Sequence, residues 1–343
     1  MTFSDAPRRV PRREKVNQAR QLWLHRYAVF TACCTFLLII AGALVTGNEA
    51  GLAVPDWPLS YGRLMPPMVG GIFYEHSHRM VASLVGFLTV ILALWLWRVE
   101  PRRWVRRLGW AALATVIAQG LLGGITVLYF LPIAVSVAHA CLAQVFFCLT
   151  VSVALFTWPP WTVCVPRPRN QRWALAGARQ RTSAGWAPNP HPPTPYVALA
   201  TSAAIFLQLM LGAAFRHSGL GLGPHLAGSA VVSVGVFWTM VRVLRSHREH
   251  AGLVRAALWL GALLLAQLFL GGGSLAARIA FRDAPQPVPL AVVVTTAHVA
   301  AGALTLASSV VLTLLAFRAG PFLPLCESAT GENACPTSAK AWS

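Results

Sequence analysis

Apolar residues form eight long runs along this chain, separated by segments rich in charge, proline and glycine. Each run reaches about 20 residues or more, the length that a helix needs to cross a hydrocarbon core of about 30 Å. The runs are rich in Leu, Ala and Val and lack the alternation of faces that a membrane barrel strand shows. They therefore predict an all-α integral membrane protein with spans at residues 27–47, 73–97, 108–130, 134–158, 195–215, 223–244, 254–276 and 290–317.

The predicted spans fall into two similar halves. Gln119-Gly-Leu-Leu-Gly-Gly124 in the third span resembles Gln267-Leu-Phe-Leu-Gly-Gly272 in the seventh, and Gln208-Leu-Met-Leu-Gly212 lies in the fifth. The fourth and eighth spans carry Ala138-His139 and Ala297-His298. Weak internal similarity is typical of repeats in membrane proteins, so we expect two pseudo-repeated four-helix bundles. We interpret the glycines as positions where helix backbones approach closely.

Polar segments set the expected organisation of the chain around these halves. A stretch rich in Pro, Arg and Gly is too polar to cross a membrane and predicts a flexible linker between the halves. The expected parts are a basic N-terminal segment (1–26), an N-terminal four-helix half (27–158), the linker (159–194), a C-terminal four-helix half (195–317) and a tail (318–343).

The net charge of +18 does not indicate nucleic acid, because the chain is 56% hydrophobic and its Lys and Arg gather in alternate connections. They concentrate at residues 8–26, 98–107, 167–181 and 242–255 and in the tail. The positive-inside rule then predicts that both termini are cytoplasmic. The expected place is the inner (plasma) membrane, ahead of the mitochondrial inner membrane. The lipid bilayer is thus one partner, nucleic acid is not, and an oligomer is left open.

Four histidines are placed alike in the even-numbered spans. His78, His139, His225 and His298 each lie within roughly the first one to two turns from the outer end of their span. Ligating side chains inside a membrane are costly and usually mark function. Histidines on two helices at equal depth suit two axial ligands of one haem iron, which predicts the pairs His78 with His139 and His225 with His298.

Other interpretations of these histidines are less well supported. A lone buried histidine is more often a hydrogen-bonded core residue than a ligand, but the recurrence in both halves favours ligation. Zinc is disfavoured because no cysteine or carboxylate joins the pairs, apart from Glu75 in the first half. Arg79 and Arg216 lie near the same layer and are candidate partners of haem propionates, although interfacial snorkelling would explain them equally well.

Glu75 is the most informative carboxylate. It precedes His78 by three residues, so both side chains occupy one helical face. The second half has no acidic counterpart, since it reads Leu222-Gly-Pro-His225. Glu75 is therefore a candidate proton-handling group beside the first pocket, with ion pairing to Arg79 as the alternative. This difference suggests a catalytic site paired with an electron-transfer or structural site.

The motifs together resemble the haem A synthase family of bacteria and mitochondria. The outer-loop run Gly51-Leu-Ala-Val-Pro-Asp-Trp-Pro-Leu59 and Glu75-His-Ser-His-Arg79 are the specific elements. The supporting elements are Gly42-Ala-Leu-Val-Thr-Gly47, the Gln-x-x-Leu-Gly-Gly turns, Ala138-His139, Arg216-His-Ser-Gly219, His225 and Ala297-His298.

The resemblance implies oxidation of the C8 methyl of haem O to a formyl group, which gives haem A for cytochrome oxidase. It implies that His78 and His139 hold the substrate haem O, that Glu75 assists the chemistry, and that His225 and His298 hold a resident haem B. Asp56 and Trp57 lie in the loop that would cover the first pocket. The implied partners are haem O with its synthase as donor, and cytochrome oxidase assembly.

Two features separate this chain from some family members. It lacks the cysteine pair that some members carry in the first outer loop, so thiol chemistry there is excluded. The outer connection between the fifth and sixth spans is very short, which favours a resident cofactor in the second half. The main rival interpretation is a di-haem cytochrome b that passes electrons without modifying haem. A transporter or a haem-handling assembly protein would explain the repeat but would leave the matched histidines without a role.

Overall fold

The computed structural model describes residues 12–162, 193–217 and 219–319. Among them, eight helices are long and apolar enough to cross a membrane. They are α1 (Arg12–Gly47), α2 (Gly70–Val99), α3 (Arg103–Leu128), α4 (Ile133–Thr157), α7 (Thr194–Arg216), α8 (Leu222–Ser246), α9 (Ala251–Ala280) and α10 (Pro289–Ala319). A one-turn helix, α5 (Pro159–Thr162), follows α4. The predicted all-α membrane fold is confirmed.

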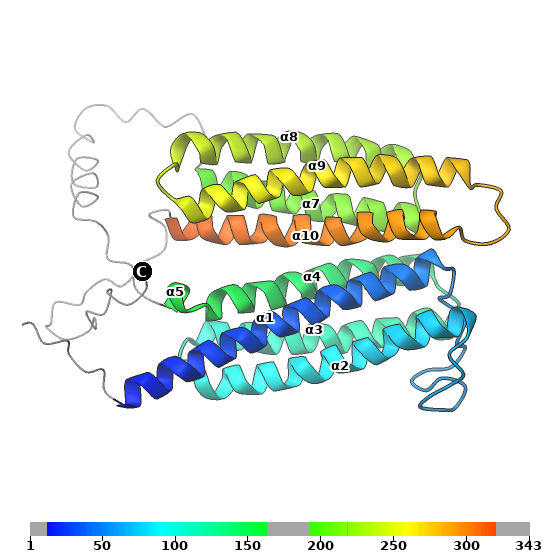
Figure 1. Cartoon of the computed structure of the whole chain (residues 1–343), viewed down its shortest axis with the longest axis horizontal. Coiled ribbons are helices and arrows are strands. Elements are labelled where there is room, and N and C mark those ends of the chain that lie inside the picture. The colour runs from blue at the N-terminus through cyan, green and yellow to red at the C-terminus, as the bar shows by residue number, and fades with distance from the viewer. Residues whose placement is uncertain (1–11, 163–192, 218, 320–343) are drawn as a thin grey trace, which may run out of the picture.

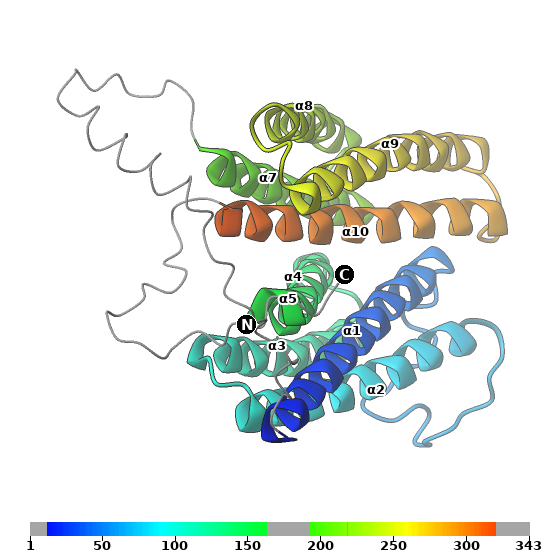
Figure 2. The ribbon, with the colours of Figure 1, turned by 60° about the vertical axis from the view of Figure 1, so that its left-hand side comes forward.

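The helices form two four-helix bundles that lie side by side (Figures 1 and 2). In each bundle every helix packs against its two neighbours: α1 to α4 form one ring and α7 to α10 the other. The bundles meet where α1 and α4 face α10 and α7. An apolar cluster of Ile39, Phe147, Ala303 and Ala307 fills part of this seam. The arrangement matches the pseudo-repeat that the sequence predicted.

The first helix begins earlier than the sequence predicted. We expected a basic segment up to residue 26 and a span from 27, but α1 starts at Arg12 and its apolar span at Gln18. Leu24 and Ala28 are completely buried and pack with Leu92 and Leu96 of α2. Arg, Gln, Ala and Leu are strong helix formers, so the helix continues through the charged region without a break. The predicted linker and tail lie almost wholly outside the described residues.

Polar side chains join the helices inside the second bundle. Ser202 of α7 lies 3.0 Å from Thr313 of α10, and Ser309 donates to Ser202 at 2.9 Å. Small polar residues of this kind let transmembrane helices pack closely and add directional contacts. Large apolar residues such as Leu265 and Phe269 lie on the outside, where lipid would contact them.

Candidate functional site

The four candidate histidines lie near the beginnings of α2, α4, α8 and α10. These helix ends lie at one end of the molecule, beside the loops that follow α1 and α9 (Figure 1). The structure therefore brings His78, His139, His225 and His298 into one layer, two in each bundle, as the sequence predicted. The α7–α8 connection, residues 217–221, is as short as expected.

Each of these histidine rings lies against a glycine on the neighbouring helix. An ideal Cβ at Gly42 of α1 would lie 3.1 Å from Cε1 of His78, and one at Gly123 of α3 would lie 3.3 Å from Cε1 of His139. The second bundle repeats the pattern. There the distances are 2.9 Å from Gly212 of α7 to His225, and 3.0 Å from Gly271 of α9 to His298. Glycine thus leaves the space that each ring occupies.

This pattern refines our interpretation of the glycines. The sequence analysis assigned them to close approach of helix backbones, but Gly42, Gly123, Gly212 and Gly271 lie against the candidate ligands. The repeat itself carried this signal, because a glycine occurs at the same place in the first, third, fifth and seventh spans. Helix spacing alone does not reveal which neighbouring side chain a glycine faces.

The two rings in the second bundle have a geometry that suits a shared metal. The ring centroids of His225 and His298 lie 6.3 Å apart, and the ring planes are inclined by 85°. A bond from a metal to an imidazole nitrogen is about 2 Å long, and the nitrogen lies about 1 Å from the centre of its ring. Two imidazoles on opposite sides of one metal therefore have ring centroids roughly 6 Å apart. In the first bundle, His78 and His139 lie on α2 and α4 and pack against Gly42 of α1 and Gly123 of α3.

Several ring nitrogens in this layer are buried without a partner. Nδ1 of His78, His139 and His298 is buried and has no hydrogen-bond partner within the part of the chain that the structure describes. Buried polar atoms normally have a partner, so an unpartnered one calls for an explanation. Paired imidazoles with unpartnered nitrogens and no carboxylate between them fit two haem groups better than zinc.

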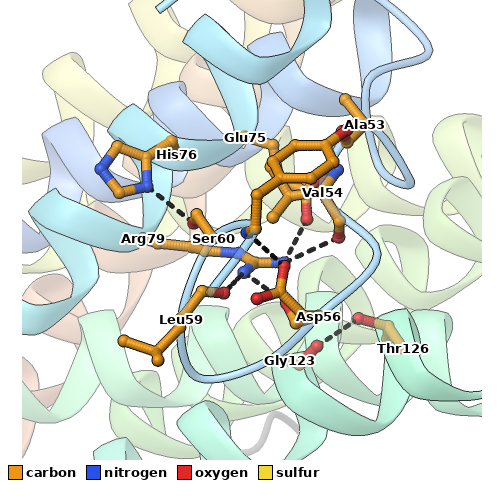
Figure 3. A network of polar contacts seen from close by, with 11 residues as sticks. Ala53, Val54, Asp56, Leu59, Ser60, Glu75, His76, Arg79, Gly123 and Thr126 are labelled. Atoms are coloured by element: carbon orange, nitrogen blue, oxygen red, sulfur yellow. Dashed lines mark hydrogen bonds and ion pairs between the residues drawn. The ribbon is translucent and has the colours of Figure 1, made fainter. Parts of the chain in front are cut away.

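Glu75, which is buried, and Arg79, which is partly buried, form an ion pair that holds the outer loop (Figure 3). Oε1 of Glu75 accepts from Nη2 of Arg79 at 2.5 Å, and Oε2 accepts from the backbone N–H of Val54 at 2.8 Å. The Arg79 guanidinium also donates to the carbonyl oxygens of Val54, Asp56 and Leu59. The ion pair that we weighed as an alternative is therefore present, and both carboxylate oxygens have partners.

These contacts bear on the predicted role of Arg79. Four of the hydrogen bonds in Figure 3 begin at Nη1 and Nη2 of Arg79, so both terminal nitrogens point to the loop and to Glu75. A propionate would have to displace one of these partners or use Nε. The arrangement gives Arg79 the task of holding the loop.

The outer loop, residues 48–69, covers part of the first bundle. An ideal Cβ at Gly124 of α3 would lie 2.8 Å from Cδ2 of Trp57, so the indole packs on α3 one residue after the glycine that faces His139. Asp56 accepts from the backbone N–H groups of Tyr61 and Gly62 at 2.6 and 2.8 Å. These bonds, with that of Gly62 the larger, hold the pKa of the Asp56 carboxyl below its usual value. Trp57 therefore packs on α3 and Asp56 shapes the loop.

Arg216 connects the two bundles. Its Nη2 donates to the carbonyl oxygen of Ala43 in α1 at 2.9 Å, next to the glycine that faces His78. The same nitrogen would lie 3.7 Å from a Cβ at Gly47, beside Thr296 of α10. The structure thus places Arg216 in the outer layer, as predicted, and gives it a partner in the other half of the chain.

Two further side chains lie beside the candidate ligands without having been predicted. The ring of Phe215 stacks on that of His225 with centroids 6.3 Å apart and an interplanar angle of 10°. The guanidinium of Arg278 lies 4.7 Å from the centroid of Phe215. Nothing in the sequence marks these residues, because the contacts join α7, α8 and α9.

His76, which also lies next to the layer, contacts the loop. Its Nδ1 lies 2.8 Å from Oγ of Ser60, and both side chains are buried (Figure 3). At the opposite end of the molecule, His247, Glu249 and His250 place one potential ligand atom each within 4.8 Å of one another. Arg242, Arg245 and Arg248 lie close to these residues in the sequence, and their positive charge disfavours a bound cation.

We predict that Gly271→Ala will weaken binding of whatever group His298 ligates. The new methyl would lie 3.0 Å from the ring and would push it away from its position. Gly272→Ala is the matched control, because a Cβ there meets nothing within 4 Å. Alanine in a helix is otherwise favoured over glycine by about 1 kcal/mol. We expect an altered visible spectrum in Gly271→Ala and an unchanged one in Gly272→Ala. If the two variants had the same spectrum, the close contact between Gly271 and the ring of His298 would be contradicted.

The sequence of this chain is similar to one protein family and to several known relatives. Residues 8–152 match the COX15-CtaA family, described as cytochrome oxidase assembly protein. The chain is 37% identical over 107 residues to a haem A synthase of Alkalihalophilus pseudofirmus, covering 30% of this chain and 36% of that protein. It is 28% identical over 274 residues to a haem A synthase of Symbiobacterium thermophilum, covering 68% and 80%.

The extent of these matches differs between relatives. A haem A synthase of Methylobacterium sp. is 31% identical over 142 residues, covering 37% of this chain and 39% of that protein. The match to the Alkalihalophilus protein likewise spans little more than a third of its length, whereas the match to the Symbiobacterium protein spans most of it.

Proposed function

We propose that this chain, whose residues 8–152 match the cytochrome oxidase assembly family, is a haem A synthase that oxidises the C8 methyl of haem O to a formyl group. The observation that carries the proposal is the layer of four histidines in two pairs, each ring against a glycine. The matching family is described as cytochrome oxidase assembly protein and the matching relatives as haem A synthases, so the comparisons do not favour the alternative of a di-haem cytochrome b.

We assign different tasks to the two histidine pairs. His78 and His139 would hold the substrate haem O, while His225 and His298 would hold a resident haem B. The outer loop with Trp57 lies over the first bundle, as a site that handles a substrate requires. The second bundle has only the short connection after α7, which suits a cofactor that stays bound. Haem iron would supply the redox chemistry, and the protein would supply ligands and a dry pocket.

Glu75 remains our candidate for assisting the chemistry in the first site. Glu75 accepts hydrogen bonds from Arg79 and from the backbone of Val54. These contacts support a role in which Glu75 holds the outer loop in place over the first bundle. A proton-handling role would require one of these partners to move. Arg216 remains a candidate propionate partner, because within the described residues its guanidinium donates one hydrogen bond, to the carbonyl oxygen of Ala43. Arg79 is the weaker candidate for that role.

The proposed setting follows from the charge pattern and the family. The protein would lie in the plasma membrane with both termini on the cytoplasmic side, because its basic connections gather there. Its candidate sites would then lie near the outer surface. Haem O would come from its synthase, and the product would enter cytochrome oxidase assembly.

Haem extraction tests the proposal directly. The chain would be expressed with a haem O synthase in a host that lacks its own haem A synthase, and the extracted haems would be separated by chromatography. We expect haem A in the cells and haem B with haem O or haem A in the purified protein. Haem B alone, with no haem A in the cells, would overturn the synthase in favour of an electron-transfer protein.

A further inference from the structure

A glutamine lies one helical turn before three of the four glycines that face the histidines. Gln119, Gln208 and Gln267 each precede such a glycine by four residues, in α3, α7 and α9. On a helix this spacing places the two residues on one face, one above the other. The fourth helix of this kind, α1, has Leu38 at the same place before Gly42.

The glutamine amides contact the helices that carry the histidines. Nε2 of Gln119 donates to the carbonyl oxygen of His139 at 2.9 Å. Nε2 of Gln208 donates to the carbonyl oxygen of His225 at 2.8 Å and lies 3.1 Å from its Nδ1. A Cβ at Gly228, three residues after His225, would lie 2.1 Å from Oε1 of Gln208, so a larger residue here would displace the amide from its present position.

The third amide occupies the corresponding place in α10. Nε2 of Gln267 lies 3.0 Å from the ideal Cβ position of Gly302, one turn after His298. Both histidine-bearing helices of the second bundle thus have a glycine beyond the histidine that leaves room for an amide. The hydrogen bonds of Gln119 and Gln208 are directional, so they restrain the rotation and height of the turns that carry His139 and His225, while the Gln267 amide packs against the turn that follows His298.

His78, the candidate ligand on α2, has an apolar residue where the other three histidines have a glutamine. Leu38 packs with Val81 and Val85 of α2 and with Phe146 in one apolar cluster. Leu38 supplies van der Waals packing but no interhelical hydrogen bond, and lipid tails are as apolar as leucine, so no hydrophobic driving force holds this contact. No glutamine amide therefore occupies the corresponding place for His78, whereas His139 and His225 each accept an amide hydrogen bond and the Gln267 amide lies against the helix that carries His298.

We propose that Gln119, Gln208 and Gln267 are positioning residues that restrain three of the four histidine ligands, and that His78 is the exchangeable ligand of the first site. The second pair would hold a permanent haem, whereas release of the haem from the first site would begin at its bond to His78 and would be completed when the bond to His139 breaks. This inference rests on the proposed function in that it takes the haem of the first bundle as the substrate.

Binding of carbon monoxide to the reduced protein measures how readily an axial histidine leaves the iron. In the parent protein, with haem O supplied, we expect one reactive haem and one unreactive haem. Gln208→Met removes the amide at nearly constant volume and should make the second haem reactive and shift its midpoint potential. Gln144→Met is the matched control, since Gln144 is a buried glutamine of α4 outside the pattern.

Leu38→Gln adds the missing amide and tests the other part of the proposal. We expect the new amide to donate to a carbonyl oxygen of α2, so carbon monoxide binding to the first haem should slow by about fivefold, the equivalent of one net hydrogen bond. This variant adds a contact, so the proposal stays testable if Gln208→Met fails to accumulate. The Gln208→Met comparison needs only the resident haem.

The outcomes separate this inference from the proposed function. Equal carbon monoxide reactivity and potential in Gln208→Met and Gln144→Met would overturn the positioning role of the glutamines. An unchanged rate in Leu38→Gln would overturn the assignment of His78 as the exchangeable ligand. Haem content is measured first, and a purified chain without any haem would overturn the proposed function itself.

Discussion

His298→Ala should remove the resident haem from the second bundle. The rings of His225 and His298 lie 6.3 Å apart, so the loss of one leaves a single axial ligand and an empty space beside Gly271. We expect retention of haem B to fall by more than about tenfold, because even partners that merely orient a ligand change affinity by about 10–100-fold. The measurement is the Soret absorbance per chain after purification, with haem extraction.

Two further measurements make this result specific. His250→Ala, at the opposite end of the molecule, should leave the Soret band unchanged. Added imidazole should restore part of the low-spin spectrum of His298→Ala, since it fits the space that the side chain left. An unchanged spectrum in His298→Ala would contradict the assignment of this residue as a haem ligand.

Glu75→Gln should abolish haem A formation while the resident haem B stays bound. The substitution removes one partner of a buried ion pair and leaves Arg79 without its counter-charge, a change that costs about 3–5 kcal/mol in buried sites. An amide oxygen still accepts from the N–H of Val54, so the defect centres on Arg79 and the loop that it holds. The ligands in the second bundle lie outside this network. Haem extraction from the variant measures both effects.

Tryptic cleavage at Arg63, an exposed loop residue, separates the two roles of Glu75. Faster cleavage together with lost activity would indicate that Glu75 acts by holding the loop. Lost activity with cleavage as slow as in the parent would favour proton handling. Asp56→Asn is the control for a change in the loop itself, because the Asp56 carboxylate accepts from the backbone of Tyr61 and Gly62 within the loop and does not contact Glu75. Loss of all haem in Glu75→Gln would contradict the division of tasks between the bundles.

The candidate site was predicted in part because its ligands repeat. His139 and His298 follow alanines in equivalent spans, and the depth of each histidine follows from its distance to the end of an apolar run. The start of α1 was missed, because hydropathy marks where a helix enters lipid and not where its hydrogen bonding begins. Arg12 to Arg26 continue the helix through local propensity.

The sequence alone determined the membrane fold, the division into two halves and the level of the four histidines, because hydropathy, spacing and helical rise act along the chain. Only the tertiary structure decided which side chains meet. Glu75 is bound by Val54 of a loop, Arg216 reaches Ala43 of the other bundle, and each histidine ring occupies the space beside a glycine of another helix. These contacts depend on how the helices are rotated and packed against one another, which no local pattern specifies.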